Sequence, residues 1–102
     1  MKLLFIIDNS KKKDLNTILT AEPYAEISFS KLGYILRDGA HFDKNGKQIL
    51  LVTVHDDKQK EYVVEKLKGI AEEVTGEEKE RIIEKIEEEE EAAEAGFGSL
   101  FG

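Results

Sequence analysis

The residues of this sequence with side chains able to hold a ligand lie in a few short stretches. Residues 8–10 read Asp-Asn-Ser, residues 11–13 are three lysines, and residues 43–46 read Asp-Lys-Asn-Gly. His41 and His55 are the only histidines, and there is no cysteine. Carboxylate and carbonyl oxygens suit a divalent cation, and lysines at the start of a helix suit a phosphate. Each stretch also has a purely structural interpretation.

Neither acidic stretch completes a metal-binding pattern. Residues 8–10 resemble the Asp-x-Ser-x-Ser loop of von Willebrand-type domains, but Lys12 stands at the second serine position. Residues 43–46 resemble the start of an EF-hand loop, which needs a glutamate at its twelfth position. Counted from Asp43, that position is Val54. We therefore predict a helix cap at residues 8–10, a hairpin turn at residues 43–46, and no bound metal.

The basic and imidazole side chains do not assemble into a catalytic group either. The three lysines of residues 11–13 can contact phosphate, lie on a solvated face, or attract the acidic C-terminus. His41 and His55 are expected to lie apart and to have surface or helix-capping roles. No nucleophile–base pair and no phosphate-binding glycine loop can be built from the chain. We predict that the protein is not an enzyme and holds no cofactor.

The charge of the chain is concentrated at its C-terminal end. Residues 75–102 contain ten glutamates against Lys79, Arg81 and Lys85, a net charge of −7. The whole chain also has a net charge of −7, so residues 1–74 are balanced. A neutral body with an acidic end lacks the positive surface that phosphate backbones require. General binding to nucleic acid is therefore not expected.

The last sixteen residues, 87–102, join five glutamates to an Ala-rich step and end in Gly-Phe-Gly-Ser-Leu-Phe-Gly. This segment resembles the C-terminus of archaeal and eukaryotic acidic ribosomal stalk proteins, which has an acidic hinge and a short Gly, Leu and Phe motif. In that family the terminal apolar residues bind translation GTPases and related factors. The resemblance implies that Phe97, Leu100 and Phe101 contact such a partner. It does not extend to the body, because stalk proteins begin with a helical dimerisation domain and this chain begins with strands.

The physical properties of this segment also indicate a binding arm. Five consecutive glutamates, residues 87–91, repel one another and favour an extended, solvated linker. Phe97, Leu100 and Phe101 have the spacing i, i+3, i+4, so one helical face can present all three to a groove. The predicted partner is a protein with an apolar groove and a basic rim. The alternatives are that the apolar residues dock on the body or that the terminus has no function.

The patterns upstream predict the elements that carry this arm. Residues 3–7 are an apolar run typical of a buried strand, and a helix over residues 10–20 follows. Alternating apolar residues over 26–42, with a β-bulge near Gly33, predict a second strand. An Asn45–Gly46 turn then joins it to a central strand over residues 48–55, with Phe42 opposite Ile49 and Ala40 opposite Leu51.

The second half of the chain is predicted to be helical. Asp56 caps a helix over residues 57–74, in which Val63, Leu67, Ile70 and Val74 form one stripe. Thr75 and Glu78 form a capping box for another helix. That helix is anchored by its only apolar residues, Ile82, Ile83 and Ile86.

The order strand, helix, strand, strand, helix predicts an α+β, ferredoxin-like sandwich with its fourth strand missing or replaced. We divide the chain into a compact domain (1–74), an accessory helix (75–86) and an acidic flexible tail (87–102). Residues 31–39 resemble part of the small PII-like nucleotide-sensing proteins, which are ferredoxin-like trimers. That resemblance implies, as the alternative, a ligand-sensing oligomer.

Length and composition agree with a small cytoplasmic protein. At 102 residues, the chain is one domain by size, too small for a large active-site cleft. Its N-terminal apolar run is shorter than the core of a secretory signal, and no run approaches a membrane span. The absence of cysteine fits a reducing compartment.

Overall fold

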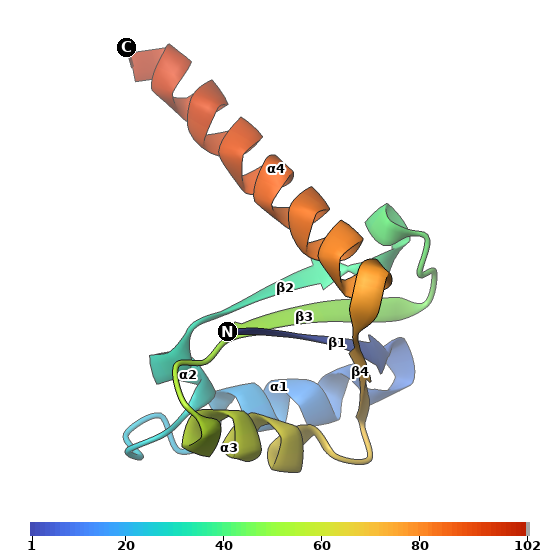
Figure 1. Cartoon of the computed structure of the whole chain (residues 1–102), viewed down its shortest axis with the longest axis vertical. Helices are drawn as coiled ribbons and strands as arrows, with labels where there is room; N and C mark the ends of the chain where they lie inside the picture. Colours follow the sequence, from blue (N-terminus) through green and yellow to red (C-terminus); the bar gives the residue numbers. More distant parts are fainter. Residues whose placement is uncertain (102) are drawn as a thin grey trace.

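A computed structural model describes the backbone of residues 1–101 and the side chains of residues 1–90. The elements are, in chain order, β1 (Lys2–Asp8), η1 (Asn9–Lys11), α1 (Lys12–Thr20), α2 (Phe29–Leu32), β2 (Tyr34–Asp38), η2 (Gly39–Phe42), β3 (Lys47–Thr53), α3 (Asp57–Leu67), β4 (Ala71–Val74) and α4 (Gly76–Phe101), where η denotes a 3-10 helix. The four strands form one antiparallel sheet in the order β2-β3-β1-β4. The α+β class predicted from the sequence is confirmed. Figure 1 shows α1 and α3 on one side of this sheet and α4 on the other.

The two central strands are apolar on both faces, which is why helices cover both faces of the sheet. In β1, Phe5 lies opposite Leu50 of β3, and Leu4 lies opposite Leu51. Leu50 belongs to the core beneath α1 and α3, whereas Leu51 belongs to the core beneath α4. A strand that is buried on both faces needs apolar residues at successive positions, and both strands have them.

The first face of the sheet is covered by α1 and α3. Leu15 and Leu19 of α1 and Val63 and Leu67 of α3 are buried against it. The remaining buried members of this cluster are Leu3, Phe5, Ile7, Phe29, Leu50, Val52 and Val54. The side chain of Asp56 accepts a hydrogen bond from the backbone N–H of Gln59 at 2.8 Å, which confirms its predicted role as the cap of α3.

The second face is covered by α4, and Phe42 of η2 also packs there. Its buried cluster consists of Leu4, Phe42, Ile49, Leu51, Val74, Ile82 and Ile86. Ile82 and Ile86, two of the three predicted anchors, are buried, and Ile83 is partly buried against the same cluster. The predicted docking of this helix through its isoleucines is therefore confirmed.

The fourth strand, predicted to be missing, is present as β4. The helix predicted over residues 57–74 ends at Leu67, because Gly69 has a φ of +87° and turns the chain. After the turn, Ala71 pairs with Ile7 and Val74 with Leu4. The apolar spacing of Val63, Leu67, Ile70 and Val74 fitted one helix, but only the first two residues lie on it. The prediction was wrong because long-range pairing with β1 prevails over a local helical pattern.

The strand predicted over residues 26–42 is also wrong in its first part. Phe29–Leu32 form the short helix α2, capped by Ser28, whose hydroxyl accepts from the N–H of Lys31 at 3.2 Å. Gly33, with a φ of +85°, then returns the chain to β2. A turn of helix, rather than a β-bulge, therefore changes the parity of the apolar residues.

The predicted two-residue hairpin turn is replaced by a longer connection. The strand β2 ends at Asp38, which lies opposite Gln48, and η2 follows. Arg37 and Ile35 therefore occupy the positions opposite Ile49 and Leu51 that were predicted for Phe42 and Ala40. The Asp38 side chain accepts from the backbone N–H of Ala40 at 3.0 Å and so caps the start of η2. The pairing of β2 with β3 ends at this residue.

Candidate functional site

The candidate site is built on α4, because the predicted partner-binding residues belong to it. Its first turns lie on the second face of the sheet through Ile82 and Ile86. At its start Glu78, predicted to close a capping box, forms an ion pair with Lys44. The hydrogen bond and charge of Lys44 lower the pKa of Glu78 below its ordinary value. The start of α4 is thus attached to the loop between β2 and β3.

The glutamate run begins where α4 is still in contact with the body. Glu87 forms an ion pair with Lys2 of β1, and Glu90 forms one with Arg37 of β2. These two glutamates are three residues apart, so they lie on neighbouring positions of one helical face. Sequence reasoning missed both pairs, since Lys2 and Arg37 are distant in the chain and unremarkable in type.

Phe97, Leu100 and Phe101 lie outside the residues whose side chains are described. The backbone of α4 includes these positions, because the helix runs from Gly76 to Phe101. The segment predicted as a tail therefore forms one helix with its accessory-helix neighbour. Figure 1 shows the C-terminal end of α4 standing clear of the sheet and of the other helices. The partner-binding role of the three residues stays a prediction.

A cleft of about 310 Å³ lies beside α4, where it passes β2. Ile86 and Ile35 contribute apolar lining, and Lys2, Glu87 and Glu90 contribute charges. Its remaining lining residues are Leu32, Gly33, Tyr34, Leu51 and Thr53. This cleft is mainly apolar with a charged rim, so it suits an aliphatic or aromatic side chain.

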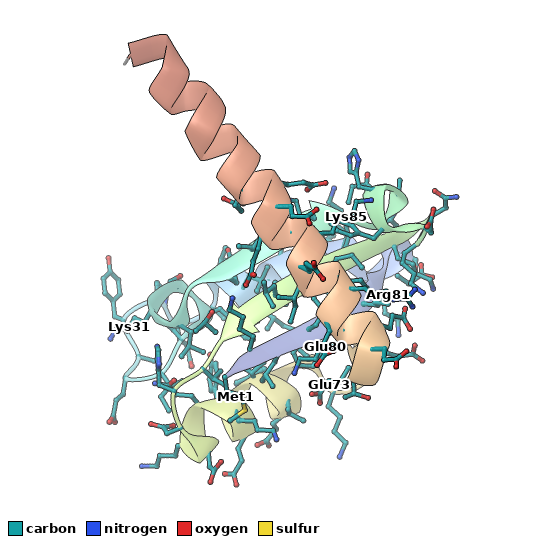
Figure 2. All side chains as sticks on the ribbon, turned by 45° about the horizontal axis from the view of Figure 1, so that its top comes forward. Met1, Lys31, Glu73, Glu80, Arg81 and Lys85 are labelled. Atoms are coloured by element: carbon teal, nitrogen blue, oxygen red, sulfur yellow. The ribbon has the colours of Figure 1, made fainter. Side chains whose placement is uncertain are left out.

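A second cleft, of about 370 Å³, lies between α4 and η2. Lys44, Arg81 and Lys85 line it together with Glu78 and Asp43, and Phe42 and Ile82 add apolar surface. Figure 2 shows Arg81 and Lys85 on the side of α4 that faces η2. Lys85 donates a hydrogen bond to the carbonyl of His41, and its Nζ lies 5.2 Å from the centre of the Phe42 ring. These contacts hold η2 against α4.

Residues 8–10 have the structural role that the sequence predicted, with one difference in detail. Asp8 caps the short helix η1, because its carboxylate accepts from the N–H of Ser10 at 2.9 Å, whereas α1 begins after Lys11 without a side-chain cap. The N–H of Ser10 and the ammonium group of Lys47 hold the pKa of Asp8 well below its ordinary value. Asn9 accepts a hydrogen bond from Gln48 at 3.0 Å. The hydrogen bonds of Asp8 and Asn9 thus join η1 to β3 and support the fold.

The lysines of residues 11–13 do not meet the described glutamates of α4. Lys11 instead donates to the carbonyl of Gly69 at 2.9 Å, beyond the C-terminal end of α3. Lys12 and Lys13 are exposed on α1. The described part of the glutamate run, up to Glu90, finds its counter-charges on the opposite face of the sheet.

The two histidines lie in different parts of the fold. His41 lies in η2, and His55 lies before α3, where its N–H donates to Gln59 at 2.7 Å. Asp43 and Gly46 adopt positive φ angles of 60° and 77°, as turn residues do. Among residues 1–90, no group of three or more His, Cys, Asp or Glu side chains is arranged to hold a metal ion.

Comparisons with protein-family models, with curated proteins and with solved structures found no match to this chain. Within the described part of the chain, no helix combines the length and the apolar character needed to cross a bilayer.

Proposed function

We propose that this protein is a non-enzymatic interaction protein, in which a small α+β domain presents the C-terminal end of α4 to a protein partner. The observation that carries the proposal is the way α4 is attached. Ile82 and Ile86 bury its first turns, and ion pairs join Glu87 to the central strand β1 and Glu90 to the edge strand β2. The residues after Glu90 therefore start from a defined position. A binding segment with a rigid attachment loses less freedom on binding than one on a free linker.

We further propose that the domain is a ferredoxin-like sandwich. The strand order β2-β3-β1-β4 supports this, because β3 lies between β1 and β2, and β1 lies between β3 and β4. Each of the helices α1 and α3 thus connects two strands that are separated by a third. This arrangement leaves the opposite face of the sheet for α4.

The chemistry of the arm defines the partner class. Phe97, Leu100 and Phe101 require an apolar groove, and the glutamates before them require a basic rim. Burial of three such side chains contributes roughly 5–8 kcal/mol. Ordering the segment opposes binding by about 2–5 kcal/mol. The difference corresponds to a dissociation constant weaker than about 1 μM, which suits a transient contact. The resemblance of residues 87–102 to ribosomal stalk proteins favours a translation GTPase.

The test compares the full chain with the variant F97A/L100A/F101A in an NMR titration with a translation GTPase. We expect the amide signals of residues 91–102 to shift in the unaltered chain and not in the variant. The matched control is Tyr24→Ala, which changes an exposed aromatic residue outside α4. Equal binding by the triple variant, or no signal change with any translation GTPase tested, would refute this partner assignment.

The second candidate function is a ligand-sensing oligomer of the PII-like kind. The cleft between α4 and η2 favours it, because the positive side chains of Lys44, Arg81 and Lys85 outnumber the carboxylates of Asp43 and Glu78 in its lining. Their charges suit a phosphate group. Titration with ATP, monitored at the amides of residues 41–44 and 78–85, tests this candidate. The variant R81A/K85A is expected to lose any shift, and an unresponsive spectrum would eliminate the candidate.

A further inference from the structure

The strand β2 is an edge of the sheet with an open side. It pairs with β3, and within the described part of the chain no other strand pairs with it. Its five residues, Tyr34–Asp38, keep exposed or half-exposed side chains. An open edge presents unpaired backbone N–H and C=O groups, which can template pairing with another strand.

The opposite edge, β4, carries charges that prevent such pairing with its own copy. Glu72 and Glu73 are both exposed at the middle of that strand. When two copies of a strand pair antiparallel about a two-fold axis, the residue at the axis faces itself. Centring the pair on either residue therefore places a glutamate opposite its own copy. Like charges in directly opposed positions destabilise a sheet.

The strand β2 lacks this obstacle, because Arg37 and Asp38 give its five residues no net charge. An antiparallel pair of β2 strands centred on Leu36 aligns all five residues. Tyr34 then lies opposite Asp38, Ile35 opposite Arg37, and Leu36 opposite itself. These opposed residues share a face, since side chains alternate with a period of two. The register is thus self-complementary.

Each of these opposed pairs has a favourable contact available. Tyr34 is 38% exposed, and its hydroxyl can donate to the carboxylate of Asp38 on a second copy. One oxygen of that carboxylate already accepts from Ala40, which leaves the other to accept the new bond. Ile35 lies on the α4 face with Arg37, whose aliphatic stem can cover it. Leu36, partly buried against the first core, gains contact with its own copy.

We propose that a second copy of this chain binds at the open edge of β2 and forms a two-fold symmetric dimer with one continuous sheet. The mainly apolar cleft beside α4 is lined in part by Tyr34 and Ile35 of this strand, so a second copy at the edge lies close to it. Five paired residues bury less surface than a standard interface, so the dimer is weak, with a dissociation constant on the order of 10–100 μM. The proposal goes beyond the proposed function and does not depend on Phe97, Leu100 or Phe101.

Sedimentation velocity of the full chain at concentrations across this range tests the proposal. We expect a shift from monomer to dimer as concentration rises. Tyr34→Asp places carboxylates opposite each other at two symmetric positions, and we expect it to weaken the dimer at least tenfold. The double variant Y34D/D38N removes that repulsion and keeps a capping side chain at position 38, so we expect it to recover most of the association.

The matched control is Tyr24→Asp, which makes the same change at a tyrosine that is 94% exposed and lies outside β2, in the segment between α1 and α2. It should leave the dimer unchanged, and a thermal melt should show that each variant is folded. Amide exchange at residues 34–38 should slow as the concentration of the unaltered chain rises. A monomer at every concentration, a trimer, or equal effects of the two tyrosine variants would overturn the proposal. Loss of association in F97A/L100A/F101A but not in Tyr34→Asp would also overturn it, because the C-terminus would then form the contact.

Discussion

The two faces of the sheet are closed in different ways. On the first face, α1 and α3 are each connected to a strand at both ends, so the chain itself holds them in place. On the second face, α4 follows β4 and has no following strand within the described backbone. Its attachment depends on Ile82 and Ile86 and on ion pairs. The chain connections on both sides of α1 and α3 do not change with salt or pH. The contact of α4 with the sheet depends on a few side chains, so substitutions and salt can weaken it.

This difference predicts the largest loss of stability on the first face. Phe29 is fully buried, and its ring centroid lies 5.6 Å from that of Tyr62. Phe29→Ala leaves a large cavity and should reduce the free energy of unfolding by about 3–5 kcal/mol. Urea denaturation measures this loss. Tyr24→Ala, at an exposed site, should change stability by less than about 0.5 kcal/mol.

A smaller and more local loss is expected on the second face. Ile86→Ala should reduce the free energy of unfolding by about 2–4 kcal/mol, because Ile86 is fully buried against the sheet. Hydrogen exchange should show α4 opening while α1 and α3 keep their protection. The partly exposed Ile83 is the matched control, and its change to alanine should have less effect. Uniform loss of protection over all the helices would contradict the difference between the two faces.

The ion pairs of α4 should contribute less than the isoleucines. Removing both with E87Q/E90Q should cost less than about 1 kcal/mol, because partly exposed pairs are screened by water. The variant E88Q/E89Q makes the same charge change at exposed neighbours and serves as the control. Thermal melts should show a difference between the two variants at low salt that disappears near 1 M salt, where the Debye length is about 3 Å. A difference that persists there would indicate packing instead of charge.

The smallest expected effect concerns Glu78 and pH. Lys44 lowers the folded-state pKa of Glu78 below its ordinary value of 4.5. A depressed carboxyl pKa contributes stability above the unfolded pKa, and this contribution is lost as pH falls through the folded pKa. Lys44→Met should therefore be less stable than the unaltered chain above pH 4.5, with the difference shrinking at lower pH. Chemical denaturation across this range measures it, and a pH-independent difference would rule out the ion pair as the cause.

Short-range patterns predicted some of these elements well. Asp56 caps α3, the run at residues 48–53 forms most of β3, and the isoleucine spacing identified how α4 docks. The cap and the isoleucine spacing depend on residues within one or two helical turns. The β3 strand depends on an uninterrupted run of apolar residues. Errors arose where one local pattern allowed two structures. Residues 70–74 continued a helical stripe, but Gly69 with its positive φ ends α3 before them. Phe29 continued a strand alternation, but the Ser28 cap starts a helix there.

The sequence by itself determined the α+β class, the apolar residues of the central strands and the concentration of acidic charge at the C-terminal end. Only the tertiary structure decided that Ala71–Val74 is a strand and that Glu87 and Glu90 meet Lys2 and Arg37. The physical reason is distance along the chain. The pairing of β4 with β1, and the ion pairs of α4 with β1 and β2, join residues that are far apart in the sequence, so neither partner's local pattern indicates the other. Such contacts exist only once the sheet brings them together.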